Sequence, residues 1–214
     1  KVHTYVDDKD QFIVSAVGVG TIVAGGNYQE LATAAASVKD SGSGLDGSTE
    51  VFFKSRPSQK ITHKFKSGRL TSLIRVRNDD IKNLRTEMDQ VAFDFASSVN
   101  AIHKKGYVSR PIETGPNGEV PQYDRKGATT GVNFFEIGPV AKGSINALKL
   151  SQDVEEDISN IVTALDPNSP GDNRVSLAIS KLQHEKFVAG GTATLEEQYL
   201  KTVGNVGVEV GKAR

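Results

Sequence analysis

The sequence has no cysteine and no tryptophan among its 214 residues, and its only methionine is Met88. The lack of cysteine excludes a disulfide scaffold, a thiolate metal site and a cysteine nucleophile. The 26 lysines and arginines balance 26 acidic residues, which argues against a whole-chain role in binding nucleic acid or a membrane surface. No apolar run reaches the roughly 18 residues that a transmembrane helix needs. The length suits one full-sized domain or two small ones.

Motifs of catalysis and metal binding are also missing. The four histidines lie far apart and none stands at the spacing of a zinc motif; they are His3, His63, His103 and His184. Gly18-Val19-Gly20 starts like a dinucleotide loop, but Val23 takes the place of the third glycine, so we interpret a bent strand. We expect the histidines in ordinary surface or packing roles and assign no catalytic, cofactor-binding or metal-binding residue.

Residues 1–67 predict a β-rich outer domain. Val2 to Val6 and Phe12 to Val19 are rich in strand-forming residues, and the acidic cluster between them suits a hairpin loop. Gly25-Gly26-Asn27 signals another turn. Farther on, the alternation of apolar and polar residues from 60 to 66 predicts a strand that forms a hairpin with 51–54.

After Gly68 the period changes, and residues 68–106 predict a long helix. Apolar side chains recur every seven residues, at Ile74, Ile81, Met88, Phe95 and Ile102. A capping signal at Asn78 would divide this helix, and Gly106 would end it. We expect this heptad seam to pack lengthwise against other helices as a coiled coil does, mainly as core within the chain.

The rest of the chain predicts an irregular excursion at 107–150, with strands near 132–137 and 146–150, and then C-terminal helices at 151–214. Helical spacing runs through 152–165, through 172–188, and onward from the capping box of Thr194 and Glu197. The fold class is therefore α+β, a long-helix bundle domain with an appended β-rich domain. Because the chain opens on Lys1 and its last apolar stripe is still running at Arg214, we expect a fragment of a longer protein.

One segment, residues 51–78, is strongly basic and has no acidic residue. Its charges are Lys54, Arg56, Lys60, Lys64, Lys66, Arg69, Arg75 and Arg77. Phenylalanines interleave with them, so one interpretation is nucleic-acid binding. The strand-like alternation favours a second interpretation, in which the cations keep a sheet edge soluble. A contact patch for an acidic neighbouring subunit is the third.

Several ordered motifs resemble one family. Gly68-Arg69-Leu70-Thr71-Ser72-Leu73-Ile74-Arg75-Val76-Arg77-Asn78 is similar to a G-x-L-x-x-L-L-x-x-R-[DN] stretch. Met88 to Ala92 and Asn100 to Gly106 look like L-D-x-L-A and N-x-x-H-x-x-G, and Phe134-Phe135, Gly171-Asp172-Asn173 and Gly190-Gly191 continue the match in order. These residues resemble the family of flagellar hook-associated protein 1 (FlgK), the hook–filament junction protein, over about 65–212. Residues 1–64 match it only in character.

The resemblance implies a structural component of the bacterial flagellum without catalysis or cofactors. Family members are exported unfolded by the flagellar type III apparatus and act outside the cell as adaptors in the motility organelle. Implied partners are identical subunits, the hook protein, the second junction protein and an export chaperone for a missing C-terminal segment, with no nucleic acid and no membrane. A missing N-terminal helix would cover Ile74, Met88 and Phe95, and the fragment alone would be monomeric.

Two alternatives stay open. The β domain could serve as an extracellular carbohydrate-binding or hydrolytic module, which would require a deep pocket with convergent polar groups. The chain could also be another flagellar axial protein, such as the hook cap.

Overall fold

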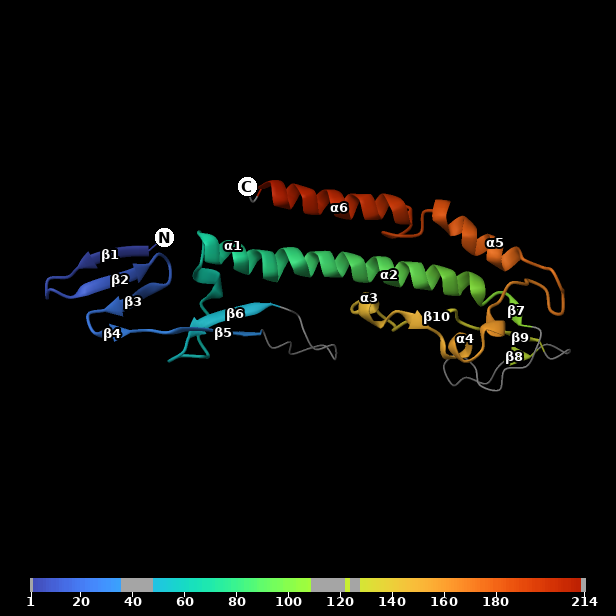
Figure 1. Cartoon of the computed structure of the whole chain (residues 1–214), viewed down its shortest axis with the longest axis horizontal. Coiled ribbons are helices and arrows are strands. Elements are labelled where there is room, and N and C mark those ends of the chain that lie inside the picture. Colours follow the sequence, from blue (N-terminus) through green and yellow to red (C-terminus); the bar gives the residue numbers. More distant parts are fainter. Residues whose placement is uncertain (1, 36–47, 109–121, 124–127, 213–214) are drawn as a thin grey trace. The chain divides into compact units, whose positions relative to one another are not determined.

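A computed structural model describes residues 2–35, 48–108, 122–123 and 128–212 (Figure 1). It divides into two compact units, Lys1–Arg85 and Thr86–Arg214, and each is described by itself. Small antiparallel sheets accompany one long helix and several shorter ones. The α+β class predicted from the sequence is confirmed. The glycine-rich stretch from Ser41 to Ser48, whose composition predicts a flexible loop, lies outside the described residues except for Ser48.

The first unit opens with a four-stranded antiparallel sheet of order β1-β2-β3-β4. Its strands are β1 (Val2–Val6), β2 (Phe12–Ala16), β3 (Gly20–Ala24) and β4 (Asn27–Tyr28). The acidic hairpin loop and the Gly25-Gly26 turn lie where the sequence predicts them. The Gly18–Gly20 segment is a turn between β2 and β3, not the bent strand we expected, because Gly18 and Gly20 have φ values of +82° and +109°.

The same unit holds a second, two-stranded sheet, in which β5 (Leu31–Ala35) pairs with β6 (Thr49–Phe53). Of the hairpin predicted between 51–54 and 60–66, only one antiparallel bridge, Phe52 with Lys60, is present, and Thr62–Lys64 forms a short 3-10 helix, η1, instead of a strand. The Thr62 hydroxyl accepts a hydrogen bond from the Val51 amide at 2.8 Å and donates to Glu50 at 2.5 Å. A loop thus occupies the edge of β6 where a strand was expected. Ile61, fully buried, packs with Val51 and Phe53 in the core of this unit.

An unbroken helical run follows, made of α1 (Arg69–Arg75), η2 (Val76–Asp80) and α2 (Ile81–His103). The predicted break at Asn78 is a turn of π-helix inside this run. The end near Gly106 is confirmed. The residues of α2 that are fully covered are Ala92, Ala96, Val99, Asn100 and His103, whereas the heptad seam is only half-buried and Ile81 is exposed. The most buried residues of α2 therefore lie on a face that is shifted from the heptad seam.

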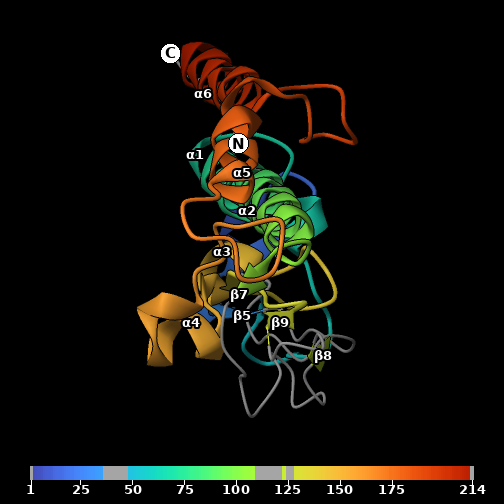
Figure 2. The same ribbon diagram turned by 90° about the vertical axis from the view of Figure 1, so that its right-hand side faces the viewer.

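The second unit attaches two small sheets to α2, one of order β7-β9-β8 and one of β10 with β11. Their strands are β7 (Tyr107–Val108), β8 (Gln122–Tyr123), β9 (Thr129–Thr130), β10 (Phe135–Glu136) and β11 (Lys149–Leu150). The predicted strands near 132–137 and 146–150 shrink to β10 and β11, because Ser144–Ala147 forms the short helix α3. Figures 1 and 2 show β7 and β9 gathered at the C-terminal end of α2.

Shorter helices than predicted follow in this unit. They are α4 (Gln152–Glu156), the 3-10 turn η3 (Ile158–Asn160), α5 (Arg174–Lys181), the 3-10 turn η4 (Leu182–His184) and α6 (Leu195–Lys212). The helix predicted through 152–165 is wrong beyond Glu156, because Asp157 is extended and caps η3. The helix predicted to reach Val188 ends early as well, because Val188, fully buried, bridges to Ala193 instead.

Helix α6 buries two polar residues and leaves most of its apolar stripe exposed. The predicted capping box is confirmed: Thr194 and Glu197 each bond the other's backbone amide, at 2.9 and 3.1 Å. Gln198 and Thr202 are buried, and the Thr202 hydroxyl donates to Glu87 of α2 at 3.1 Å. Tyr199 and Val203 of the predicted stripe are 62% and 50% exposed. Leu195 at the start of the stripe is half-buried, but Val206 and Val210 farther along are exposed as well.

Candidate functional site

The polar side chains along α2 in the second unit bond backbone groups of segments distant in sequence. Four of them do so: Asp89, Asp94, Asn100 and His103. The segments they hold lie in the excursion and in the loops between the C-terminal helices. The sequence singles out Asn100 and Asp89 only as parts of motifs, and it predicts an ordinary surface or packing role for His103. The structure gives each a mechanical role.

His103 is fully buried at the end of α2 and uses both ring nitrogens. Nδ1 lies 2.7 Å from the carbonyl oxygen of Val132, and Nε2 accepts a hydrogen bond from the amide of Val162 at 2.8 Å. Only the neutral tautomer with hydrogen on Nδ1 satisfies both contacts. Burial lowers the pKa of this imidazole below its usual value, although the Val132 carbonyl opposes that shift. The expected packing role of His103 is thus a structural bridge between two loops.

Asn100, one helical turn before His103, fastens the neighbouring strand. Its Oδ1 accepts hydrogen bonds from the amides of Phe134 and Phe135, both at 2.9 Å, and its Nδ2 donates to the Phe135 carbonyl at 2.9 Å. The ring of Phe134 packs edge-on against His103, with centroids 5.4 Å apart. The N-x-x-H spacing places both side chains on one face of the helix, so together they hold residues 132–135.

Gly106 completes this motif because no side chain fits at its position. A Cβ there would overlap the carbonyl oxygen of Ala164 and the side chain of Val162, and would come within 2.8 Å of Val175. The close approach allows the Tyr107 amide to donate to the Ala164 carbonyl at 3.0 Å. The N-x-x-H-x-x-G motif is therefore a packing device that closes the end of α2 against the 162–164 segment.

Asp89 and Asp94 anchor two further segments to α2. The carboxylate of Asp89 accepts hydrogen bonds from the amides of Gly143 and Ile145, at 2.8 and 3.0 Å, and so caps the start of α3. Asp94 accepts from the amide of Ala189 at 3.2 Å. Both acids bind backbone donors, which is a structural use of a carboxylate and leaves no pair poised for acid–base chemistry.

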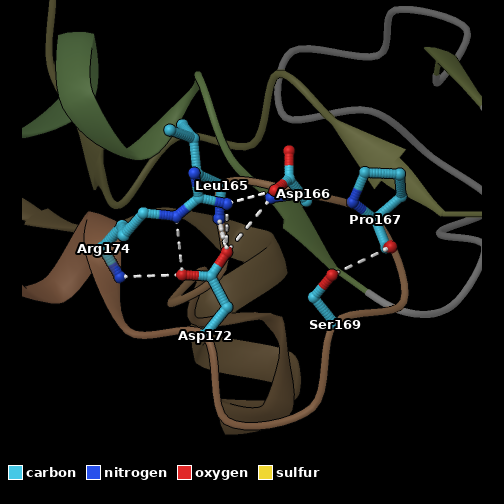
Figure 3. Close-up of polar contacts among 6 residues, drawn as sticks. All are labelled: Leu165, Asp166, Pro167, Ser169, Asp172 and Arg174. Carbon is cyan, nitrogen blue, oxygen red and sulfur yellow. Dashed lines mark hydrogen bonds and ion pairs between the residues drawn. The ribbon is translucent and has the colours of Figure 1, made fainter.

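The Gly171-Asp172-Asn173 motif forms a charged loop before α5 (Figure 3). One oxygen of Asp172 accepts the Leu165 amide at 2.9 Å, and the other accepts the Arg174 amide at 3.1 Å. The Arg174 guanidinium also pairs with Asp172 and Asp166. These bonds hold the pKa of Asp172 well below, and that of Arg174 above, their usual values. Asp172 thus ties the loop to the start of α5.

In the first unit, Asn78 performs a comparable task from the π-helical turn. Its Oδ1 accepts the Thr49 amide at 2.7 Å, and its Nδ2 donates to the Thr49 carbonyl at 3.0 Å. This side chain pairs with the start of β6 as a neighbouring strand would. A π turn shifts the helical register and is often found where a side chain must be re-aimed. Asn78 therefore clamps the β5–β6 sheet to the helical run.

The remaining histidines of the described residues lie apart from one another on the surface. His3, His63 and His184 are all exposed, on β1, η1 and η4. Within the residues that the structure describes, no group of three or more acids or histidines could hold a metal ion, and no helix is long and apolar enough to cross a membrane. A hollow of about 440 Å³ beside α2 is lined by Asn100, Lys104, Asn133 and Glu136 among others. Two buried side-chain oxygens, Asn133 Oδ1 and Asp153 Oδ2, have no hydrogen-bond partner among the described residues.

Comparison with known proteins agrees with the motif resemblance. A family model described as the helical domain of flagellar hook-associated protein FlgK matches residues 1–117. This match includes the β region that the motifs alone did not cover. The flagellar hook-associated protein 1 of Buchnera aphidicola subsp. Schizaphis graminum is 35% identical over 49 residues, which are 23% of this chain and 9% of that protein. Because the family model matches more than half of the chain, the protein belongs to the FlgK family of flagellar hook-associated proteins.

Proposed function

We propose that this protein is a non-enzymatic adaptor at the junction between the hook and the filament of the bacterial flagellum. Support comes from the family match and from the use that the second unit makes of its polar residues. Asn100, His103, Asp89 and Asp94 of α2 all bond backbone groups. Side chains occupied in this way serve to fix a shape, which is what a structural component requires.

The observation that carries the proposal furthest is the arrangement of α6. Its polar residues Gln198 and Thr202 are buried, while Tyr199, Val203 and Val210 stay at least half exposed. Apolar residues at this spacing form the contact stripe of helix–helix packing. In an axial assembly the stripe would pack against further helices of the complete protein or of neighbouring copies.

The proposed partners are identical subunits, the hook protein and the second junction protein. We also propose export through the flagellar type III apparatus, aided by a chaperone for the C-terminal segment, and a final location outside the cell in the flagellum. The lack of cysteine suits a chain that passes unfolded through a narrow channel. The carbohydrate-binding alternative gains no support, because His3 and His63 lie exposed and apart from any cluster in the described residues.

Deleting the gene in its flagellated source tests the junction role. We expect cells that build hooks, carry no filaments and release filament subunits into the medium, and we expect the full-length gene to restore filaments. Normal filaments in the deletion strain would contradict the proposal. Loss of the hooks themselves would favour the hook-cap alternative.

A further inference from the structure

The basic segment that runs from β6 to the start of α1 carries several cations on a folded backbone. Lys54 pairs with Glu30 at 2.8 Å, and Lys60 lies 4.6 Å from the ring centre of Phe52. The side chains of Arg56, Lys64, Lys66 and Arg69 make no hydrogen bond or ion pair with any residue that the structure describes. These four residues are called the cationic platform.

Backbone bonds hold this platform in place. The Ile61 amide donates to the Val51 carbonyl at 2.8 Å, and Ile61 itself is fully buried in the core. The Thr62 hydroxyl bonds both Val51 and Glu50 of β6. Cations on a folded backbone bind a partner with less loss of backbone entropy than cations on a free tail.

The chain itself carries a matching acidic segment in its second unit. Residues 150–173 hold six acidic side chains and no basic one. Four of these are already used, since Asp153 is buried, Asp157 caps η3, and Asp166 and Asp172 pair with Arg174. Glu155 and Glu156 lie exposed on α4, where Glu156 accepts a hydrogen bond from the side chain of Gln152 at 2.7 Å. A neutral chain thus separates its charge into a basic surface on one unit and an acidic one on the other.

We propose that the cationic platform of one copy binds the acidic surface of α4, with Glu155 and Glu156, on a second copy. This proposal rests on the proposed function and names a contact within the assembly. A contact between two different surfaces is heterologous, so repeated use of it generates a ring or a helical array. A single-stranded nucleic acid is a poorer partner, because Phe53 of the basic segment is buried rather than offered for base stacking.

Such a contact is weak between isolated copies, because exposed ion pairs contribute little each and salt screens them. The chain therefore stays monomeric in dilute solution. The contact gains strength when neighbouring copies are held side by side and several pairs form together.

Disulfide trapping tests the contact directly, because the chain has no cysteine of its own. Lys66→Cys protein is mixed with Glu156→Cys protein at high concentration under mild oxidation, and products are identified by intact mass. We expect the mixed dimer to exceed both homodimers several-fold, and to fall by about fivefold or more when salt rises from about 0.05 M to about 0.5 M. Asp8→Cys, on the exposed β1–β2 loop, is the matched control partner. Equal trapping with Asp8→Cys, or no preference for the mixed dimer, would overturn the proposal.

Charge reversal gives an independent arm. Lys64→Glu with Lys66→Glu should abolish the trapping preference, and so should Glu155→Lys with Glu156→Lys. Mixing the two reversed proteins, each with a reporter cysteine at Arg69 or Gln152, should restore it. The wild-type chain is also tested for binding to anionic vesicles and to single-stranded DNA. If it binds either one, if reversal of Lys64 and Lys66 abolishes that binding, and if the mixture of reversed proteins does not restore the trapping, the partner is a polyanion and the proposal is overturned. The deletion phenotype does not depend on these charges, so failure of this contact and failure of the junction role are distinguishable.

Discussion

Both units hold short β segments against a helix with an apolar core, but they differ in the buried polar bonds that they add to it. In the first unit, β6 contributes Val51 and Phe53 to an apolar core, and one side chain, Asn78, clamps its end. In the second unit, Val132 and Val162 belong to a second apolar core, and the strands and loops are also held by buried polar groups, chiefly Asn100 and His103, and by a contact that only Gly106 permits. An apolar core loses stability in proportion to the surface removed, whereas a buried hydrogen-bonded group is costly to leave without its partner.

The largest effect should come from His103→Ala. This change leaves the Val162 amide and the Val132 carbonyl without partners in a buried site and opens a cavity. We expect the second unit to lose about 3–5 kcal/mol of unfolding free energy, measured by urea denaturation. Lys105→Ala, at an exposed position nearby, is the control and should change little. A loss for His103→Ala as small as that of the control would remove the distinction between the units.

Gly106→Ala should come next, because the added methyl group overlaps Ala164 and Val162. We expect a loss of about 2–3 kcal/mol, seen as a lower midpoint in thermal or urea unfolding. Gly138→Ala is the matched control, since a Cβ at Gly138 meets nothing within 4 Å. If both alanine variants unfold alike, close packing at the end of α2 is not what holds the 162–164 segment.

Asn78→Ala should have a smaller effect, because the apolar core of the first unit remains. Loss of the two bonds to Thr49 should lower stability by about 1–2 kcal/mol. Hydrogen exchange should show a faster Thr49 amide, with little change at β10 in the other unit. The exposed Asn83→Ala serves as the comparison. An unchanged Thr49 exchange rate would contradict the clamp.

Asp153→Asn should have the smallest effect, and it should raise the unfolding free energy rather than lower it. Burial, with help from Glu156, raises the pKa of this carboxyl, and its Oδ2 has no partner in the described residues. Stability from a raised carboxyl pKa is present below the unfolded value and is lost as pH rises through the folded one. The amide should therefore stabilise the chain by about 0.5–1 kcal/mol near pH 7 and have no such benefit near pH 3. Equal midpoints for the two proteins at pH 7 would refute this.

Local signals predicted much of the fold. The heptad spacing predicted the long helix, the Thr194 and Glu197 capping box predicted the start of α6, and glycine and acidic clusters predicted the turns of the first sheet. The errors arose where tertiary contacts override local pattern. Residues 60–66 alternate like a strand, but the Thr62 hydroxyl bonds β6 and Thr62–Lys64 forms η1 instead.

The candidate site could be predicted only in part. The N-x-x-H spacing places Asn100 and His103 on one helical face, and that signal is present in the sequence. Their partners are 29 to 59 residues away, in segments without periodicity. Likewise, no local sequence signal indicates that Asp89 bonds the backbone at Gly143 or that Asn78 bonds the backbone at Thr49. Pairings of this kind depend on the folded arrangement of the loops.

The ionisation state of His103 tests the central claim, that the motif residues of α2 act as structural bridges. Nitrogen-15 spectra of the imidazole, recorded from pH 8 to pH 5, report its tautomer and its pKa. The structure requires hydrogen on Nδ1 and a free lone pair on Nε2, with a pKa lowered by burial. Stability from this depressed pKa is present above about 6.5 and is lost as pH falls through the folded value. We expect the Nδ1–H tautomer to persist well below pH 6.5; an Nε2–H tautomer, or a titration at or above pH 6.5, would contradict the account.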